Sequence, residues 1–303
     1  MAESNEFATR LAPRRKVLVL GAQGMLGHML VRVLSDRHEV SGSLTGRYES
    51  VGRLQKVLSK RACVESVDVT DFVAVTRAIL DREPNVVVNC VGLIKHKMDR
   101  QSALKAIMVN SAFPHQLAKF CSDQQIRLIH FSTDCVFRGR PGLKQPSDVP
   151  DATDVYGMTK RLGEIDYGSA LTLRTSFVGR QLSGNEELFE WILSQRGNSI
   201  KGFRRAVYSG LTTQALSNVV QRVIEEQGHL SGLFQVASAP ISKFDLIMKF
   251  NEVLELGLTV EPDTSYECDR SLDGSEFQKV TGIEVPSWDT MLNNFVADQY
   301  FYA

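Results

Sequence analysis

The glycines of the segment GAQGMLG, residues 21–27, constrain the fold of this chain more than any other feature. They follow a short apolar run at residues 16–20, which predicts a strand, and precede an amphipathic stretch at residues 25–35, which predicts a helix. Glycines at this spacing permit a tight turn, close approach of the backbone to a pyrophosphate and close packing of the helix on the strand. We therefore expect a dinucleotide-binding turn formed by Gly21, Gln23, Gly24, Met25, Leu26 and Gly27.

Short apolar runs alternate with helical stretches through the first half of the chain. Strands are predicted at residues 16–20, 38–43, 62–67, 85–91, 126–132 and 170–175, and helices at residues 25–35, 71–82, 102–122 and 155–167. The strands are nearly continuous apolar runs, as in a parallel sheet that is covered on both faces. The pattern predicts an α/β fold with a doubly wound parallel sheet of the Rossmann type, in which Asp71 is the N-cap of the second helix.

The second half of the chain is less regular. Helices are predicted near residues 186–195, 212–226, 242–256 and 287–296, and a strand at residues 233–237 is expected to return to the first sheet. We expect a disordered tail at residues 1–14 and a dinucleotide-binding Rossmann domain at residues 15–176 plus about 211–238. A smaller C-terminal α/β substrate-binding lobe is expected at about residues 177–210 plus 239–303.

The charge balance and the cysteines narrow the class of protein. The chain has 35 basic and 35 acidic residues, so nothing predicts binding to nucleic acid or to a membrane surface. The apolar run near the N-terminus is too short to span a bilayer, and the tail lacks the apolar core of a signal peptide. The five cysteines are scattered, which predicts neither a disulfide framework nor a metal site and favours a reducing, cytoplasmic compartment.

The end of the second predicted strand decides which nicotinamide cofactor is expected. An acidic residue there would bind the ribose 2′-hydroxyl, but this chain has Ser43 and Arg47. A hydroxyl and a guanidinium suit a 2′-phosphate, so NADPH is favoured over NADH, with a solvated loop charge as the alternative for Arg47. Asp68 is a candidate acceptor for the adenine amine and equally a candidate turn residue. Residues near the ends of the third and fourth strands complete the predicted cofactor site: Val69, Cys90, Val91 and Gly92.

A phenol, an ammonium and a hydroxyl form the predicted catalytic group. Tyr156 and Lys160 are four residues apart in a predicted helix, so their side chains share one face. Ser132 and Thr133 follow the fifth predicted strand. Because an unperturbed phenol has a pKa of about 10, we expect the ammonium of Lys160 to lower the pKa of Tyr156 so that it can protonate a carbonyl oxygen. A surface helix pair is the alternative.

The segments GAQGMLGH, FSTDCVFRG, VYGMTKRLGE and LRTSFVGR, in this order, resemble the extended short-chain dehydrogenase/reductase superfamily. Within it, the chain is most similar to the dTDP-4-dehydrorhamnose reductase family, over about residues 16–290. The resemblance implies NAD(P)H-dependent reduction of a 4-keto-6-deoxy nucleotide sugar. It implies that Thr133 rather than Ser132 is the active hydroxyl, that Tyr156 and Lys160 also contact the cofactor, and that Asn110 positions the lysine through water. A homodimer is the expectation from the superfamily.

The residues after Thr133 distinguish the activities of this superfamily. Related dehydratases have Thr-Asp-Glu at this point, whereas this chain has Asp134 and Cys135, so dehydration is not expected. GDP-fucose synthases, which epimerise and then reduce, have a catalytic cysteine at the offset of Cys135, where a thiolate can abstract a proton beside a keto group. They also need a histidine from the following lobe, and this chain has none between His130 and His229. We therefore expect Cys135 to be a packing residue, with a bifunctional epimerase–reductase as the alternative.

Cations of the second half are candidates for binding the diphosphate of a nucleotide sugar, because a planar guanidinium matches phosphate oxygens. The basic cluster at residues 201–205 is expected in a loop, and solvated surface charge is the alternative for each cation. Trp191 and Trp288 could stack on a base or sugar, although core packing is favoured. The predicted substrate contacts are Thr133, Asp134, Cys135, Arg204 and Arg270.

A third function belongs to a different class. The regulatory subunit of methionine adenosyltransferase resembles the same reductase family, so a non-catalytic NADP-binding regulator is a further alternative. The presence of Thr133, Tyr156 and Lys160 weighs against this alternative.

Overall fold

The computed structural model describes residues 13–94, 102–182, 187–297 and 299–302, so most of the predicted tail lies outside the described residues. Its larger sheet has seven strands in the order β10-β6-β5-β4-β1-β2-β3. Each neighbouring pair of strands is parallel. The strand order reverses between β4 and β1, which confirms the predicted doubly wound arrangement.

The bounds of this sheet are close to those predicted. Its strands are β1 (Lys16–Leu20), β2 (Glu39–Ser43), β3 (Cys63–Val64), β4 (Val86–Asn89), β5 (Arg127–Thr133), β6 (Leu171–Thr175) and β10 (Gly232–Gln235). The accompanying helices are α1 (Met25–Ser35), α2 (Phe72–Arg82), α3 (Ala103–Ala106), the π-helical η5 (Ile107–Ala112), α4 (Phe113–Asp123), α5 (Val155–Leu162) and α7 (Thr213–Glu226). Asp71 caps α2 as predicted, because its side chain accepts hydrogen bonds from the amides of Val73 and Ala74.

The core explains why the strands are continuous apolar runs. Along β1, Val17 and Val19 belong to one buried cluster, which contains residues of α1 and α7. Leu18 and Leu20 belong to a second buried cluster, on the side of α2 and α4. Both faces of the strand therefore lie in apolar surroundings, and no polar alternation is present in the sequence.

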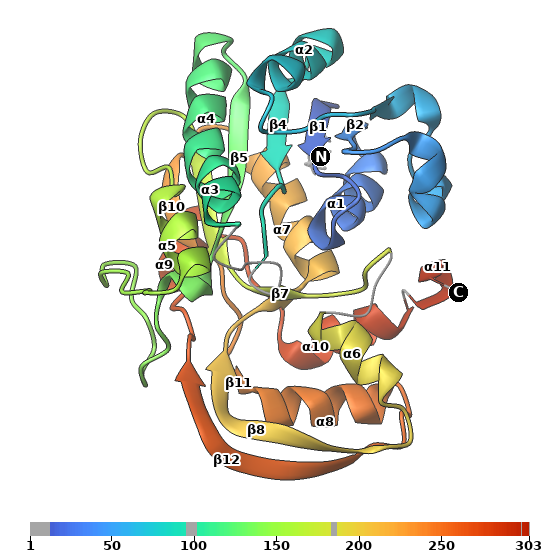
Figure 1. The fold of residues 1–303 in the computed structure, drawn as a ribbon, viewed down its shortest axis with the longest axis vertical. Coiled ribbons are helices and arrows are strands. Elements are labelled where there is room, and N and C mark those ends of the chain that lie inside the picture. Colours follow the sequence, from blue (N-terminus) through green and yellow to red (C-terminus); the bar gives the residue numbers. More distant parts are fainter. Residues whose placement is uncertain (1–12, 95–101, 183–186, 298, 303) are drawn as a thin grey trace, which may run out of the picture.

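A second, three-stranded sheet has the order β11-β8-β12 and lies below the large sheet in Figure 1. It consists of β8 (Ser199–Tyr208), β11 (Ile241–Ser242) and β12 (Thr259–Asp269), packed with α8 (Lys243–Val253). A two-stranded sheet pairs β7 (Phe177–Val178) with β9 (Leu211–Thr212). The remaining elements are α6 (Leu188–Ser194), α9 (Ser275–Thr281), α10 (Trp288–Ala297) and α11 (Gln299–Tyr302). The assignment of domain boundaries at about residues 176 and 238 stays a prediction.

The structure corrects three local predictions. Residues 201–205, expected in a loop, lie within β8. The helix expected at residues 155–167 ends at Leu162, where Gly163 is the C-cap. The helix expected at residues 102–122 contains a π-helical segment at Ile107–Ala112, a departure from α geometry that is frequent at functional sites.

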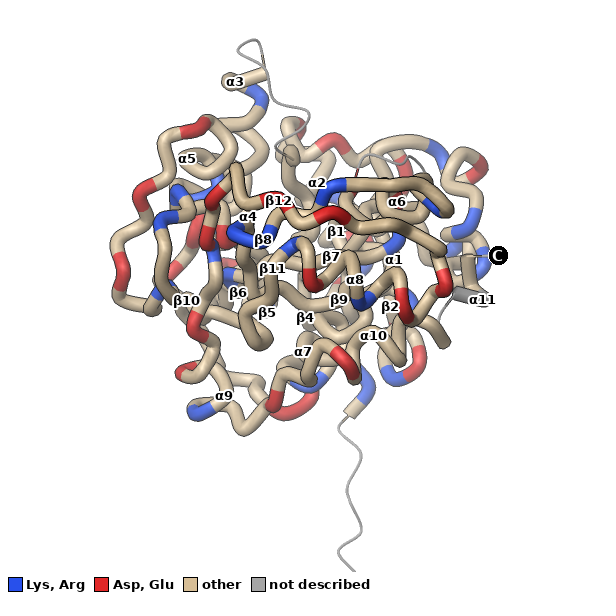
Figure 2. Tube along the Cα trace, turned by 90° about the horizontal axis from the view of Figure 1, so that it is seen from below, with Lys and Arg blue, Asp and Glu red and all other residues tan. Residues whose placement is uncertain are grey.

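Charged residues of both signs are interspersed along the trace in Figure 2, in line with the zero net charge. In the described part of the chain, no helix has the length and apolar character needed to cross a membrane.

Candidate active site

The glycine-rich turn joins β1 to α1 at the carboxyl edge of the large sheet. Gly21 has a φ of +79°, in the left-handed region that favours glycine. A Cβ atom on Gly27 would lie 2.1 Å from the carbonyl oxygen of Gly21, so the helix packs directly against the turn. The N-cap of α1 is Gly24, and no side chain of the described residues caps this helix end. The unpaired amides and the positive end of the helix dipole fit the pyrophosphate of a dinucleotide.

The residues that follow β2 surround this turn. Ser43 is buried, and its Oγ accepts a hydrogen bond from the amide of Gly21 at 3.1 Å, so this hydroxyl positions the turn. Gln23 donates a hydrogen bond to Thr45 Oγ1 at 2.6 Å. Arg47 is exposed, and within the described ranges its guanidinium makes no hydrogen bond or ion pair. The role of this exposed guanidinium with a 2′-phosphate stays a prediction.

Residues after β3 and β4 line the same edge. The carboxylate of Asp68 accepts hydrogen bonds from the amide and the hydroxyl of Thr70 at 2.9 and 2.8 Å, which lower the pKa of Asp68 and form a local turn. Gly92 is exposed, and a Cβ atom there would lie 3.5 Å from Asn110 Oδ1 and 4.0 Å from Lys160 Nζ. The glycine thus leaves space next to the lysine. Of the other predicted contacts, Leu26 and Val69 are buried, and Met25, Cys90 and Val91 are partly buried.

Thr133, Tyr156 and Lys160 converge at the carboxyl end of β5. Thr133 is the last residue of β5, and its hydroxyl accepts a hydrogen bond from the amide of Cys135 at 3.1 Å. The Thr133 hydroxyl donates a hydrogen bond to Asp134 Oδ1 at 3.2 Å. Tyr156 and Lys160 come from α5, and Thr133 is close enough to Tyr156 to influence its pKa. A Cβ atom on Gly157 would lie 2.3 Å from the carbonyl oxygen of Cys135. Glycine after the tyrosine therefore allows α5 to approach the end of β5.

Burial dominates the protonation of this group. It raises the pKa of Tyr156 above the ordinary phenol value, and the smaller effect of the Thr133 hydroxyl, which lowers this pKa, does not offset it. The lowering expected from Lys160 is thus wrong for this structure, in which Lys160 Nζ donates a hydrogen bond to the carbonyl oxygen of Phe131 at 2.7 Å. Burial lowers the pKa of Lys160 to about 8, and the negative charge of Glu164 opposes that shift.

Asn110 lies in the π-helical segment and is buried. Its side chain accepts a hydrogen bond from the amide of Leu93 at 2.8 Å and donates to the carbonyl oxygen of Leu93 at 3.2 Å. It also donates to Thr159 Oγ1 at 3.3 Å. Asn110 therefore joins the segment after β4 to α5, beside Lys160. A water-mediated contact with Lys160 stays a prediction.

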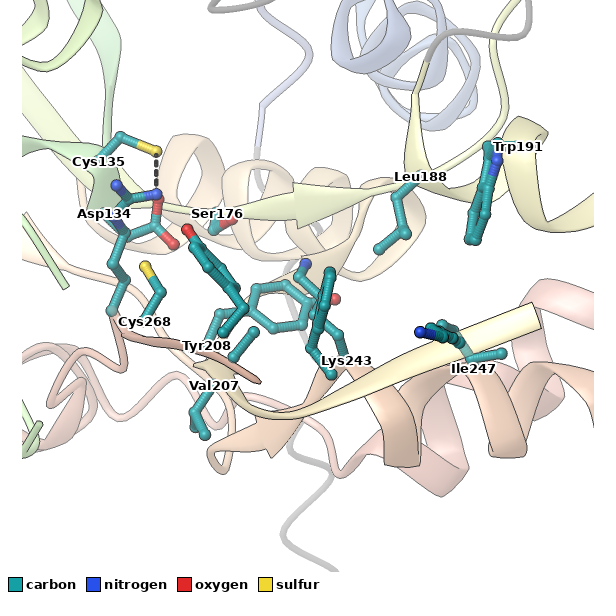
Figure 3. Close-up of a pocket in the computed structure, with 15 residues that line it drawn as sticks. Asp134, Cys135, Ser176, Leu188, Trp191, Val207, Tyr208, Lys243, Ile247 and Cys268 are labelled. Carbon is teal, nitrogen blue, oxygen red and sulfur yellow. Dashed lines mark hydrogen bonds between the residues drawn. The ribbon is translucent and has the colours of Figure 1, made fainter. Parts of the chain in front are cut away.

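A cavity of about 360 Å³ extends from the end of β5 to the second sheet. Figure 3 shows Asp134 and Cys135 at one end, Leu188 and Trp191 at the other, and Lys243 between them. Asp134 and Cys135 directly follow Thr133 in the chain, whereas Thr133, Tyr156 and Lys160 are not among the residues that line the cavity.

Two residues of the cavity that were not predicted carry polar groups that make no hydrogen bond within the described part of the chain. Lys243, the first residue of α8, has its Nζ 3.6 Å from the centroid of the Tyr208 ring. It makes no hydrogen bond or ion pair with any residue that the structure describes, and the Tyr208 hydroxyl is buried without a hydrogen-bond partner. Burial lowers the pKa of Lys243 to about 8, opposed first by Asp134. Lys243 follows the N-cap Ser242 with no motif around it, so the sequence contains no signal for its position.

Some of the predicted substrate contacts line the cavity and one does not. Arg270 lines the cavity, and its Nη1 donates a hydrogen bond to Cys135 Sγ at 3.4 Å, drawn as the dashed line in Figure 3. Arg204 does not line the cavity, because its guanidinium lies over the ring of Phe244, 4.0 Å from the centroid. Burial raises the pKa of Asp134, and it raises the pKa of Cys135 to about 12.

The two tryptophans also differ. Trp191 is 37% exposed and lines the cavity, whereas core packing had been favoured for it. Trp288 is buried, as expected, and its Nε1 donates a hydrogen bond to the carbonyl oxygen of Ala239 at 2.9 Å. Trp191 is therefore the tryptophan that a ligand in the cavity can reach.

Comparison with known proteins finds relatives that match this chain over most of their length and of its own. A probable low-salt glycan biosynthesis reductase, Agl14 of Haloferax volcanii, is 29% identical over 266 residues, which cover 83% of this chain and 85% of the relative. The dTDP-4-dehydrorhamnose reductase of Aggregatibacter actinomycetemcomitans is 24% identical over 307 residues, which cover 93% of this chain and 98% of the relative.

Among solved structures, the dTDP-4-dehydrorhamnose reductase of Bacillus anthracis in complex with NADP has the same fold. It superposes with a TM-score of 0.77 at 19% identity, over 94% of this chain and 99% of that chain. The model of the RmlD substrate binding domain family matches residues 15–301. Since this match covers nearly the whole sequence, the chain belongs to the RmlD substrate binding domain family.

Proposed function

We propose that this protein is an NADPH-dependent reductase of the short-chain dehydrogenase/reductase class that converts the 4-keto group of a 6-deoxy nucleotide sugar to a hydroxyl. The observation that supports this proposal most is the convergence of Thr133, Tyr156 and Lys160 at the sheet edge that carries the glycine-rich turn. The two residues that follow Thr133, Asp134 and Cys135, line a cavity. The relatives reported above are named as reductases, and one was solved with NADP. Arg47 supports NADPH over NADH.

The residues of the chain fit the proton chemistry of such a reduction. The cofactor, when bound, supplies the hydride. Tyr156, whose pKa is raised, is protonated at neutral pH and can donate its proton to the substrate oxygen. The Thr133 hydroxyl orients that oxygen and stabilises the phenolate that remains. The ammonium of Lys160 has three donors, so it can keep its bond to Phe131 while it binds ribose hydroxyls and stabilises the phenolate.

The cavity suggests how the substrate lies. The sugar would occupy the end formed by Asp134 and Cys135, next to Thr133. The diphosphate would lie at Lys243, whose desolvated ammonium makes no hydrogen bond or ion pair with the described residues, with Arg270 nearby. The base would stack on Trp191 at the far end, where an aromatic face is exposed.

Cys135 separates simple reduction from the epimerising alternative. With a pKa of about 12, its thiol stays protonated at neutral pH and is a poor base. This supports reduction without epimerisation. The regulatory alternative is disfavoured by the assembled catalytic group. Cytoplasmic location and a homodimer stay predictions.

An assay of NADPH oxidation tests the proposal with 4-keto-6-deoxy sugars that carry dTDP, UDP or GDP. We expect turnover with at least one nucleotide, and a loss of at least about a hundredfold in Tyr156→Phe, the lower end for lost acid catalysis. Binding of NADPH without oxidation by any of these sugars would favour the regulator. Incorporation of solvent deuterium at a ring carbon during turnover would favour the epimerase–reductase.

A further inference from the structure

A buried ion pair lies directly behind the candidate active site, between the end of α5 and the large sheet. Arg174 of β6 donates two hydrogen bonds to Glu164, from Nε to Oε1 and from Nη2 to Oε2, each at 2.8 Å. The two side chains are 4% and 9% exposed. Ser132 Oγ donates a third hydrogen bond to Glu164 Oε1 at 2.6 Å. A carboxylate with this number of donors is held in one position.

The same network reaches the loops beside the cavity. Arg174 Nη1 donates to Gln235 Oε1 of β10 at 3.4 Å. The amide nitrogen of Gln235 donates to the carbonyl oxygens of Lys144 and Asp273 at 3.0 and 3.1 Å. Glu164 is therefore joined, through Arg174, to β10 and to two loops from different parts of the sequence, which lie on the β10 side in Figure 1.

Three successive residues of β5 connect this pair to the catalytic group. Phe131 accepts the hydrogen bond of the Lys160 ammonium, Ser132 donates to Glu164, and Thr133 carries the catalytic hydroxyl. Glu164 lies just beyond the C-cap Gly163 of α5, four residues after Lys160, and its negative charge opposes the lowering of the Lys160 pKa by burial. The carboxylate of Glu164 thus binds Ser132, which lies between Phe131, the acceptor of the Lys160 ammonium, and Thr133.

We propose that Glu164 is a positioning residue for the reduction, because its carboxylate keeps Lys160 charged and holds the end of β5 in register with α5. The role in reduction rests on the proposed function. Lys160 is 6% exposed, and a buried ammonium needs an opposite charge nearby to stay protonated.

The other titratable groups around Lys160 supply no negative charge. His130 of β5 is neutral, because burial and the charge of Lys160 lower its pKa well below the ordinary value. Tyr156 of α5 is neutral, since its pKa is raised. Arg174 of β6 is positive and is paired with Glu164. Among the described residues, Glu164 is therefore the anionic side chain that favours the charged form of Lys160, in addition to its pairing with Arg174.

The pH dependence of NADPH affinity tests this role without any sugar substrate. Fluorescence titrations between pH 6 and 9 should show wild-type affinity falling as pH rises through about 8, where Lys160 loses its proton. In Glu164→Gln this transition should move down by about one unit, because the variant removes the opposite charge that raises the pKa of Lys160. Affinity should then be about fivefold weaker than wild type at pH 8 and nearly equal at pH 6.

Two further variants distinguish the effect of the Glu164 charge on Lys160 from a general structural effect of the substitution. Glu164→Asp keeps the carboxylate and should keep the transition near that of wild type. Glu190→Gln is the matched control, because Glu190 pairs with Arg180 at 2.8 Å and is similarly buried at 12% exposure, away from Lys160. It should not move the transition. The double variant Glu164→Gln/Arg174→Met removes both charges, so it replaces the single variant if Glu164→Gln fails to fold.

A Glu164→Gln protein that loses affinity equally at every pH, with the transition unchanged, would overturn the proposal and leave Glu164 a structural residue. The alkaline limb of kcat/KM should shift with the binding transition. If no keto sugar is reduced but the binding transition moves as expected, the proposed function fails while the effect of Glu164 on Lys160 stands.

Discussion

Replacement of Gly27 by alanine should both destabilise the protein and weaken its binding of NADPH. The new Cβ would lie 2.1 Å from the carbonyl oxygen of Gly21, 2.9 Å from its carbonyl carbon and 3.0 Å from Ala22 Cα. All three atoms are backbone, so no side chain can rotate away. Ordinary contact with Cβ begins at 3.4 Å, and the difference from 2.1 Å requires a movement of about 1.3 Å between α1 and the turn.

The energetic result is the sum of two opposing effects. Overpacking costs about 1–3 kcal/mol, and contact with rigid backbone places Gly27→Ala at the upper end. Alanine regains about 1 kcal/mol over glycine through its helix propensity. We expect a net loss of about 2 kcal/mol in the free energy of unfolding. Because a misplacement of about 1 Å can cost a hundredfold, the Kd for NADPH should rise at least about tenfold, or about 1.4 kcal/mol.

Urea unfolding and fluorescence titration with NADPH measure the two effects. Gly228→Ala is the matched control, since a Cβ atom there has nothing within 4 Å and the residue is exposed. The control should bind NADPH like wild type. If Gly27→Ala unfolds and binds like Gly228→Ala, the proposed packing of α1 on the phosphate-binding turn is refuted.

Three further changes test the rest of the site. Lys243→Met should raise KM for the nucleotide sugar at least about tenfold, the weight of a charged hydrogen bond, with a smaller effect on kcat; an unchanged KM would remove Lys243 from the diphosphate site. The same variant should be more stable than wild type at pH 7, where Lys243 is charged and buried in the wild-type protein. This advantage should shrink between pH 8 and about 10.4, because in this range Lys243 of the folded protein has lost its proton while Lys243 of the unfolded chain still binds one. Arg204→Ala should change KM less than about twofold in the same assay, since Arg204 does not line the cavity. Glu164→Gln should lose about 3–5 kcal/mol in urea unfolding by leaving Arg174 buried and unpaired, and the added change Arg174→Met should restore most of it.

The large sheet could be predicted because its strands are buried on both faces. The bounds of β1 and α1 agree with the prediction, and the return of residues 232–235 to the first sheet was also expected. Local sequence was sufficient here, since an apolar run followed by glycines or a cap defines each element without knowledge of its neighbours.

The second sheet could not be predicted in the same way. In β8 the buried residues Ile200, Gly202, Ala206 and Tyr208 alternate with more exposed ones that include Lys201 and Arg205, so the segment resembles a basic loop. Strand β12 is mostly exposed and pairs with β8 from about sixty residues away, through a register shift between Asp263 and Glu267. Its pairing depends on contacts that no local pattern records.

The residues of the candidate site also differ in whether local sequence could predict them. Thr133, Tyr156 and Lys160 lie in elements with strong local patterns, and the structure brings them together. Lys243 and Tyr208 meet only because β11 pairs with the end of β8. Burial, which sets the pKa of Tyr156 and of Lys160, is a property of the folded protein and is absent from spacing alone.

Transfer of deuterium from the cofactor to the sugar tests the central claim most directly. NADPH deuterated at both hydrogen positions of the nicotinamide C4 would be incubated with dTDP-4-keto-6-deoxyglucose and related 4-keto sugars, in parallel with wild type and Tyr156→Phe, and the product would be examined by NMR. We predict one deuterium at C4 of the sugar, none at other ring carbons, and a rate at least about a hundredfold lower in Tyr156→Phe. Absence of deuterium from every product, or equal rates for the two proteins, would contradict the assignment of Thr133, Tyr156 and Lys160 as a carbonyl-reducing site.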